Sequence, residues 1–253
     1  MKSTVLVASC AFLAGFIGNS SAALIIGGSD LLSSTYANQL ETWLGEGPIA
    51  LTNIFDKALG DDASDFHSAA DGKGRTIVVM EAAESFGTGL SAIIGGYDPQ
   101  SWSSLGIYNE TPSDTDRTGF LFNLSSTSLF RQRLTTDLIN NANAGIYQTG
   151  NAVGLGPTFG LGHDIHVDDN LTTGYSYMYS YGVNMPIGNS VVDGNPFDIQ
   201  GDVVFGRIEI FTISPASASV PEPGSLALVM LALSGFVVSR RRRQPLTSVK
   251  CGP

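Results

Sequence analysis

The chain has 253 residues, of which 43% are hydrophobic and only 14% are charged, and its formal net charge is −10 at pH 7. This composition favours a folded protein over a disordered one and excludes a basic groove for nucleic acid. Six of the 13 Lys and Arg residues lie at the ends, at Lys2, Arg240 to Arg243 and Lys250. Seven basic residues are left against all 23 acidic ones, and a net −16 favours a soluble, cation-attracting domain.

The first segment has the pattern of a secretory signal peptide. A basic start at Lys2 precedes an apolar run over residues 4–17 and then a run of small residues. We expect signal peptidase to cut after Ala22 or Ala23, which makes residues 1–23 the signal peptide. A buried N-terminal helix is the alternative.

Two segments that follow have helical spacing. Leu40, Trp43 and Leu44 predict an amphipathic helix over residues 34–44, with a serine before it as the cap. A second, shorter helix is predicted over residues 63–70.

The rest of the central chain consists of short apolar runs separated by turn residues. These runs are residues 76–80, 91–94, 119–124, 158–161, 164–167, 176–181 and 203–213. With 30 glycines and many Asn, Asp, Ser and Thr residues around them, they predict an α+β fold, mostly β: an antiparallel β-sandwich with flanking helices. No composition break or internal repeat divides residues 24–213, so we expect a single domain.

Four tyrosines alternate along one of the predicted strands, at Tyr175, Tyr177, Tyr179 and Tyr181. At a period of two, their rings would share one face. An exposed ladder of rings would suit stacking on sugars, whereas rings packed into the sandwich would belong to its core or cover its edge.

The last predicted strand carries a charge pair. Arg207 and Glu209 fall on one face, and Ile208 and Ile210 fall on the other. We expect one buried face and, on the outer face, a solvated Arg207–Glu209 pair that contributes little to stability.

The end of the chain has the layout of a short membrane segment. It consists of a small-residue linker (214–219), a Pro-Glu-Pro motif (220–224), an apolar run (225–239), four arginines and a tail (244–253). Fifteen helical residues span about 22 Å, less than the roughly 30 Å hydrocarbon core. The run therefore predicts a stop-transfer helix that enters the inner membrane transiently, with the arginines on the cytoplasmic side.

This order of features resembles the PEP-CTERM sorting signal of Gram-negative bacteria, over residues 220–243. The residues that carry it are Val220, Pro221, Glu222, Pro223, Gly224, Arg240, Arg241, Arg242 and Arg243. The resemblance implies recognition by an exosortase, a membrane cysteine protease that cuts near the Pro-Glu-Pro motif. The protein would then reach the cell surface or the exopolysaccharide matrix. The tail after the arginines departs from the usual pattern, in which such signals stop there.

Motifs within residues 32–213 occur in an order that resembles the TLDc domain. They include Phe66, His67, Asp71, Gly72, Gly74, Gly95, Gly96, Trp102, Gly156, Pro157, Phe159, Gly160, His163 and Asp164. The resemblance implies a β-sandwich of two antiparallel sheets flanked by helices. Eukaryotic members are associated with oxidative-stress resistance and with the vacuolar ATPase, without an established set of catalytic residues. We carry over only the fold, because this chain is predicted to be exported.

Three histidines are candidates for chemistry. His163 and His166 have a metal-like spacing, but residues three apart on a strand point to opposite faces, so we expect structural histidines. His67 near Asp71 would suit a general base with an acidic orienter, but we expect it to pack and hydrogen-bond in the fold. The chain has no Gly-x-Ser-x-Gly, HExxH or P-loop motif.

Clustered carboxylates offer two calcium alternatives. Asp168, Asp169 and Asn170 supply oxygen ligands, although such residues more often form a turn. Asp61, Asp62 and Asp65 are expected to cap a helix. The segment from Asp71 to Gly74 predicts a tight turn and no phosphate cradle.

The only cysteines, Cys10 and Cys251, lie in the end segments. The central domain therefore has no thiolate chemistry, no cysteine-ligated metal and no disulfide. Lipidation of Cys10 in a lipobox-like sequence is an alternative that leaves an unusually short apolar region. We expect no cofactor and no metal.

These features predict a non-enzymatic, exported surface or extracellular-matrix protein. Its expected partners are signal peptidase and exosortase during export, with exopolysaccharide as a candidate and no nucleic acid. The alternatives are an extracellular glycan-active enzyme that uses carboxylates, and a module that binds calcium or polysaccharide.

Overall fold

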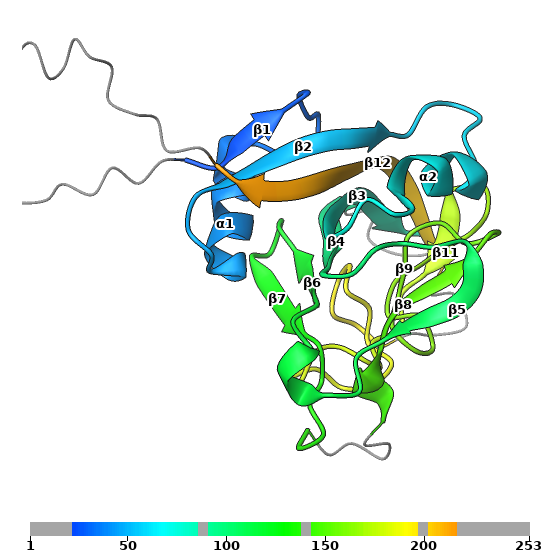
Figure 1. The fold of residues 1–253 in the computed structure, drawn as a ribbon. Helices are drawn as coiled ribbons and strands as arrows, with labels where there is room; N and C mark the ends of the chain where they lie inside the picture. The colour runs from blue at the N-terminus through cyan, green and yellow to red at the C-terminus, as the bar shows by residue number, and fades with distance from the viewer. Residues whose placement is uncertain (1–21, 86–90, 138–142, 197–201, 217–253) are drawn as a thin grey trace, which may run out of the picture. The chain divides into compact units, whose positions relative to one another are not determined.

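A computed structural model describes residues 22–85, 91–137, 143–196 and 202–216, all within one compact unit, Met1–Ala216 (Figure 1). The predicted signal-peptide core, the Pro-Glu-Pro motif, the apolar helix and the arginine cluster lie outside these ranges. None of the helices within the ranges is long and apolar enough to cross a membrane.

The main sheet follows the order β1-β2-β12-β3-β4-β6-β7, with β11 and β10 attached at one end of β12. Its strands are β1 (Leu24–Ile26), β2 (Ile49–Asp56), β12 (Asp202–Pro215), β3 (Thr76–Glu84), β4 (Ser91–Asp98), β6 (Phe120–Asn123), β7 (Ser128–Arg131), β10 (His166–Val167) and β11 (Thr173–Tyr175). The β1–β2 pair is parallel and the other pairs are antiparallel, so the sheet is mixed.

A second, three-stranded sheet has the order β5-β8-β9. Its strands are β5 (Leu105–Glu110), β8 (Tyr147–Ala152) and β9 (Thr158–Phe159), and the short 3-10 helices η1 (Asp114–Asp116) and η2 (Ala144–Ile146) precede β6 and β8. Together the sheets form a sandwich-like, mostly β fold with two α-helices, which confirms the predicted fold class.

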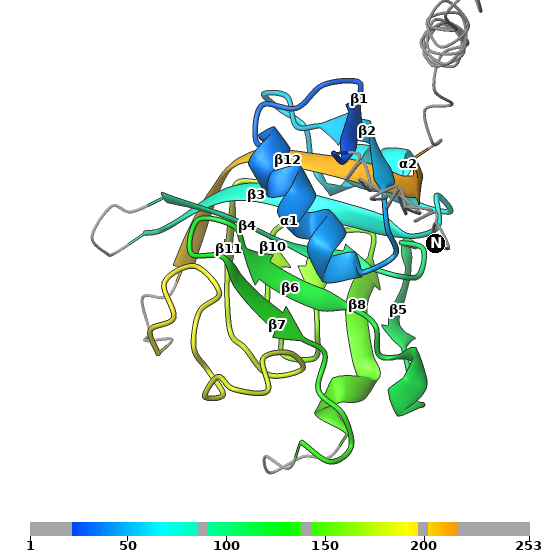
Figure 2. The same ribbon diagram turned by 90° about the vertical axis from the view of Figure 1, so that its left-hand side faces the viewer.

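The main sheet is covered on both faces. Along β3, Val78 and Met80 point into a core shared with the second sheet, and Ile77 and Val79 point into a core under α1 (Ser34–Leu44). This alternation follows from the period of two in a strand. Figure 2 shows α1 lying across its face of the sheet.

Both predicted helices form, each with a side-chain cap. Ser33 caps α1 by accepting the Tyr36 N–H, and Gly45 ends the helix in a left-handed conformation. In α2 (Ala63–Ala70), Asp62 and Asp65 form a reciprocal capping box, as expected for these carboxylates.

The structure confirms some of the predicted strands and contains others that were not predicted. The runs expected at β3, β4, β6, β9, β10 and β12 contain strands, whereas β1, β2, β5, β7, β8 and β11 were not predicted. The strand expected over residues 176–181 is wrong, because β11 ends at Tyr175 and an irregular segment follows. Strands such as β5 (LGIYNE) and β8 (YQTGNA) carry Gly and Asn, so pairing rather than intrinsic preference determines them.

The predicted solvated pair of Arg207 and Glu209 is wrong. From Ile208 onward, alternate β12 residues do point to opposite faces, but both faces are covered, so Glu209 is buried. Its carboxylate accepts the Asp30 N–H at 2.6 Å and the Ser29 hydroxyl, within the segment that links β1 to α1. Arg207 instead pairs with the Asp30 carboxylate at the surface.

These contacts predict unequal effects of two substitutions. Glu209→Ala should lower the free energy of unfolding by about 3 kcal/mol, because it removes the acceptor for buried donors. Arg207→Ala should cost less than about 0.5 kcal/mol, because it removes only a surface ion pair. Urea denaturation of the purified protein measures both values, and equal small losses would support the solvated pair instead.

Candidate functional site

The motif aromatics form a packed row inside the domain. The ring of Trp102 meets Phe66 edge-on at 5.2 Å and Phe159 edge-on at 5.3 Å, and its indole N–H donates to the Thr76 hydroxyl at 2.8 Å. A Cβ at Gly96 would lie 2.6 Å from the Phe159 ring. This part of the motif is therefore core packing.

The neighbouring motif glycines are required by close contacts as well. A Cβ at Gly95 would lie 1.9 Å from the Val78 carbonyl oxygen, and one at Gly156 would lie 2.6 Å from Leu171. Pro157, which follows Gly156, is buried. These positions therefore hold the layers close together.

His67 ties α2 to the turn after β8. Its Nδ1 lies 2.8 Å from the Asp71 carboxylate, and its Nε2 lies 3.0 Å from the Ala152 carbonyl and 3.1 Å from the Leu155 carbonyl. The ring is 5% exposed, so both nitrogens are used within the fold and neither faces a substrate. The arrangement is that of a structural link and not of a general base.

The turn after Asp71 has the predicted form. Gly72 and Gly74 both have positive φ values (70° and 77°), and the Gly72 N–H donates to the Trp102 carbonyl at 3.2 Å. The turn thus fixes the segment that carries Trp102.

Asp164 is fully buried and holds an irregular segment together. Its carboxylate accepts the backbone N–H groups of Tyr179, Ser180 and Tyr181 at 2.7, 3.0 and 2.9 Å. Burial raises its pKa to about 7, against the opposing effect of these donors. Gly160, at φ 78°, leaves room for the carboxylate, since a Cβ there would lie 1.9 Å from Oδ2.

The expectation that His163 and His166 point to opposite faces is wrong. His163 lies before β10 in a turn, at φ 66°, and its ring stacks on His166 with centroids 4.7 Å apart and planes 7° apart. His163 Nδ1 bonds the Tyr175 hydroxyl at 2.8 Å, and His166 Nε2 bonds Asp168 at 3.0 Å. The two rings form a stacked pair at the edge of β11.

The predicted tyrosine ladder does not form. Tyr175 packs against the histidine pair, whereas Tyr181 is fully buried and donates its hydroxyl to the Gln148 carbonyl at 2.8 Å. The four rings therefore do not share an exposed face, because only Tyr175 lies in a strand.

The acidic clusters act locally. Asn170 Oδ1 accepts the N–H groups of Thr172 and Thr173, which forms the turn expected after Asp168. Asp61 accepts the Ala58 N–H beside the α2 cap. Within the described ranges, no three His, Cys, Asp or Glu side chains are grouped to hold a metal ion.

A buried carboxylate that the sequence did not single out lies at the end of β4. Asp98 is fully buried, and burial raises its pKa to about 7 although it accepts the Gln100 N–H at 2.9 Å. Its Oδ2 has no hydrogen-bond partner. Nothing in its local sequence distinguishes it from a turn aspartate.

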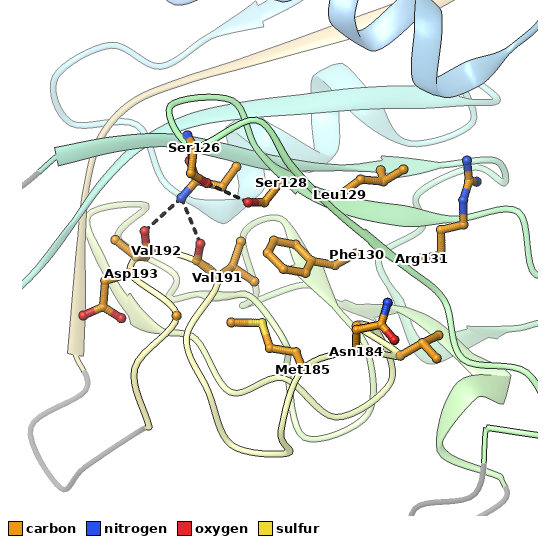
Figure 3. Close-up of a pocket in the computed structure, with 14 residues that line it drawn as sticks. Ser126, Ser128, Leu129, Phe130, Arg131, Asn184, Met185, Val191, Val192 and Asp193 are labelled. Carbon is orange, nitrogen blue, oxygen red and sulfur yellow. Dashed lines mark hydrogen bonds between the residues drawn. The ribbon is translucent and has the colours of Figure 1, made fainter.

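A pocket of about 710 Å³ lies beside β7, within the volume range of small-ligand sites (Figure 3). Its apolar lining includes Phe130, Met185, Val191 and Val192. Its polar lining consists of Asn123, Ser126, Ser128, Arg131, Asn184 and Asp193. Figure 3 shows Phe130 and Met185 side by side and Asp193 at one end, whereas the Arg131 side chain points away from them.

This pocket is hard to predict from the sequence, because three separate segments build it. β7 supplies one wall, residues 182–185 a second and residues 191–194 a third. The one local signal is a pair of glycines with positive φ values, Gly182 (77°) and Gly194 (79°), in the second and third walls.

Comparison with known families agrees with this architecture. A family model described as TLDc domain matches residues 25–214. The chain belongs to the TLDc domain family. None of the curated proteins compared with the chain matches it.

A second family model, described as PEP-CTERM protein-sorting motif, matches residues 219–243, directly after the TLDc domain. The motif indicates export, recognition by exosortase, and a cell-surface or extracellular location after processing. Both predicted resemblances are therefore confirmed.

The histidine pair predicts a pH effect on stability. Burial and the neighbouring His166 lower the pKa of His163 to about 4, from an ordinary value of 6.5. The unfolded chain therefore binds more protons between these values, and acidification favours unfolding. We expect the stability of the wild type relative to His163→Asn to be constant above about pH 6.5 and to fall as the pH approaches 4.

Urea unfolding at several pH values measures this difference. Asparagine suits the left-handed backbone at this position and does not titrate, so the titration of groups that do not contact His163 cancels. A stability difference between the wild type and His163→Asn that does not change with pH would contradict the lowered pKa of His163.

Proposed function

We propose that this TLDc protein is a non-enzymatic component of the cell surface or extracellular matrix, with exopolysaccharide as its partner. The proposal rests on one combination: an exosortase sorting motif follows a domain whose motif groups are used inside the fold. His67 and Asp164 both bond backbone groups and neither is exposed to a substrate.

The organisation of the precursor is part of this proposal. The Ala23 side chain packs into the core under α1, and its N–H donates to the Asn38 side chain at 2.9 Å, whereas Ala22 is exposed. A cut after Ala22 would keep the buried residue. Residues 214–219 would then be the linker and 225–239 the transient membrane helix, followed by the tail at 244–253.

The alternative of a glycan-active enzyme is favoured by one observation. Asp98 and Asp164 have pKa values raised to about 7, as a general acid requires. Both side chains are fully buried, however, so a polysaccharide cannot reach them. Their burial supports structural roles.

Fractionation of cells that carry an exosortase tests the proposal. The full chain with an internal tag is compared with a variant in which Pro221, Glu222 and Pro223 are alanine. We expect the wild type to be trimmed and recovered with surface or matrix material, and the variant to stay full length in the membrane fraction. Equal size and location would contradict the sorting assignment.

The same cultures separate a structural role from catalysis. The chain length of the matrix polysaccharide should be equal with the wild type and with the retained variant. Shorter chains only where the protein is exported would contradict the non-enzymatic role and support the enzyme.

A further inference from the structure

We propose that the pocket beside β7 binds a short segment of neutral, hexose-based polysaccharide. This inference rests on the proposed function, because it names the surface through which the exported domain would hold its partner. The pocket volume of about 710 Å³ lies in the range of about 300–1,000 Å³ that small-ligand sites occupy.

The walls of the pocket are held in place by bonds behind them. Asn123 donates both amide hydrogens, to the Val191 carbonyl at 3.0 Å and the Val192 carbonyl at 2.8 Å. The buried Arg133 donates to the Met185 carbonyl at 3.0 Å. The site is therefore preformed, which reduces the entropic cost of binding.

The lining suits a sugar because it combines an aromatic ring with hydroxyl, amide and charged groups. Phe130 is half-buried and offers a ring against which the C–H face of a hexose can pack. Asn184 is exposed, and within the described ranges its side chain forms no hydrogen bond. Its amide can therefore donate to a sugar hydroxyl without losing a contact. The Arg131 side chain lies on the opposite face of β7 from Phe130 and points away from the pocket in Figure 3, so its guanidinium takes no part.

The hydroxyl pair at the mouth adds groups that both donate and accept. Ser126 Oγ and Ser128 Oγ lie 2.9 Å apart, and each has capacity for a further bond. Asp193 lies at one end of the pocket, as Figure 3 shows, and supplies an acceptor.

An added peptide strand fits this edge less well. The Arg131 carbonyl accepts the Gly182 N–H, so by the period of two Leu129 directs its own N–H and C=O to the same, outer side of β7. The segment around Tyr181 already covers Gln132, and the turn at Thr127 ends the strand on the other side. Little more than the backbone of Leu129 is open, too short for strand addition.

The charge of the site favours a neutral polymer over an acidic one. The side chain of Arg131, the one basic residue among the described residues of the lining, points away from the pocket, and Asp193 is acidic, so the pocket has no cationic character. The middle of the chain carries seven basic residues against 23 acidic ones and would repel a polyanion.

Calorimetric titration of the processed protein tests the inference. The neutral probes are maltotetraose, cellotetraose, mannotetraose and the neutral polysaccharide fraction of the producing cells. Tetragalacturonate and a library of eight-residue peptides represent the competing ligands. We expect a neutral probe to bind and the double variant Ser128→Ala, Asn184→Ala to bind it roughly tenfold more weakly, because a hydroxyl on the Phe130 face of β7 and an amide are lost.

Lys73→Ala is the control, since it removes one exposed polar side chain in a turn outside the pocket lining. Its affinity should equal that of the wild type. Equal binding by the double variant would overturn the pocket assignment. Binding of only the acidic probe or the peptides, or of no probe, would overturn the ligand class.

The two proposals can fail separately. A protein that is trimmed and recovered with the matrix, but binds no neutral probe, would overturn this site and leave the proposed function intact. A protein that binds a neutral probe but is absent from surface and matrix material would contradict the proposed function alone.

Discussion

The buried carboxylate of Asp164 is the contact on which the irregular half of the domain depends. Residues 176–180 have no regular secondary structure, so their backbone N–H groups need other acceptors. One side chain supplies acceptors for three consecutive N–H groups, from Tyr179 to Tyr181. Removing such an acceptor from the interior would leave buried donors unpaired, which costs more than the bonds contribute.

The hydrogen bonds from Asp164 to residues 179–181 also position the chain that follows. They direct Tyr181 into the core, where its hydroxyl reaches Gln148, and the chain then turns at Gly182. Residues 182–185 leave the edge of β7 and form one wall of the pocket. The proposed sugar site is thus positioned by a motif aspartate that never touches it.

Much of the layout follows from the sequence, since α1 and α2 carry caps and β3 and β12 carry strongly apolar runs. Contacts between segments that lie far apart in the chain cannot be predicted from such local patterns. In the sequence, Glu209 has the pattern of a surface residue, but in the fold the segment at Ser29 covers it. Likewise, the turn at His163 places its ring against that of His166. The pocket likewise joins three segments, none of which has a distinctive motif.

Hydrogen exchange of the backbone amides bonded to Asp164 tests most directly whether this motif aspartate stabilises the fold. In Asp164→Asn, an NH2 donor replaces Oδ2, the acceptor of the Ser180 N–H. The Ser180 amide should then exchange at least about tenfold faster, while Oδ1 keeps Tyr179 and Tyr181 paired and β3 stays protected. Asp169→Asn, an exposed neighbour, should leave these rates unchanged. Wild-type protection of the Ser180 amide in Asp164→Asn would contradict the structural role of Asp164 and leave it free for another function.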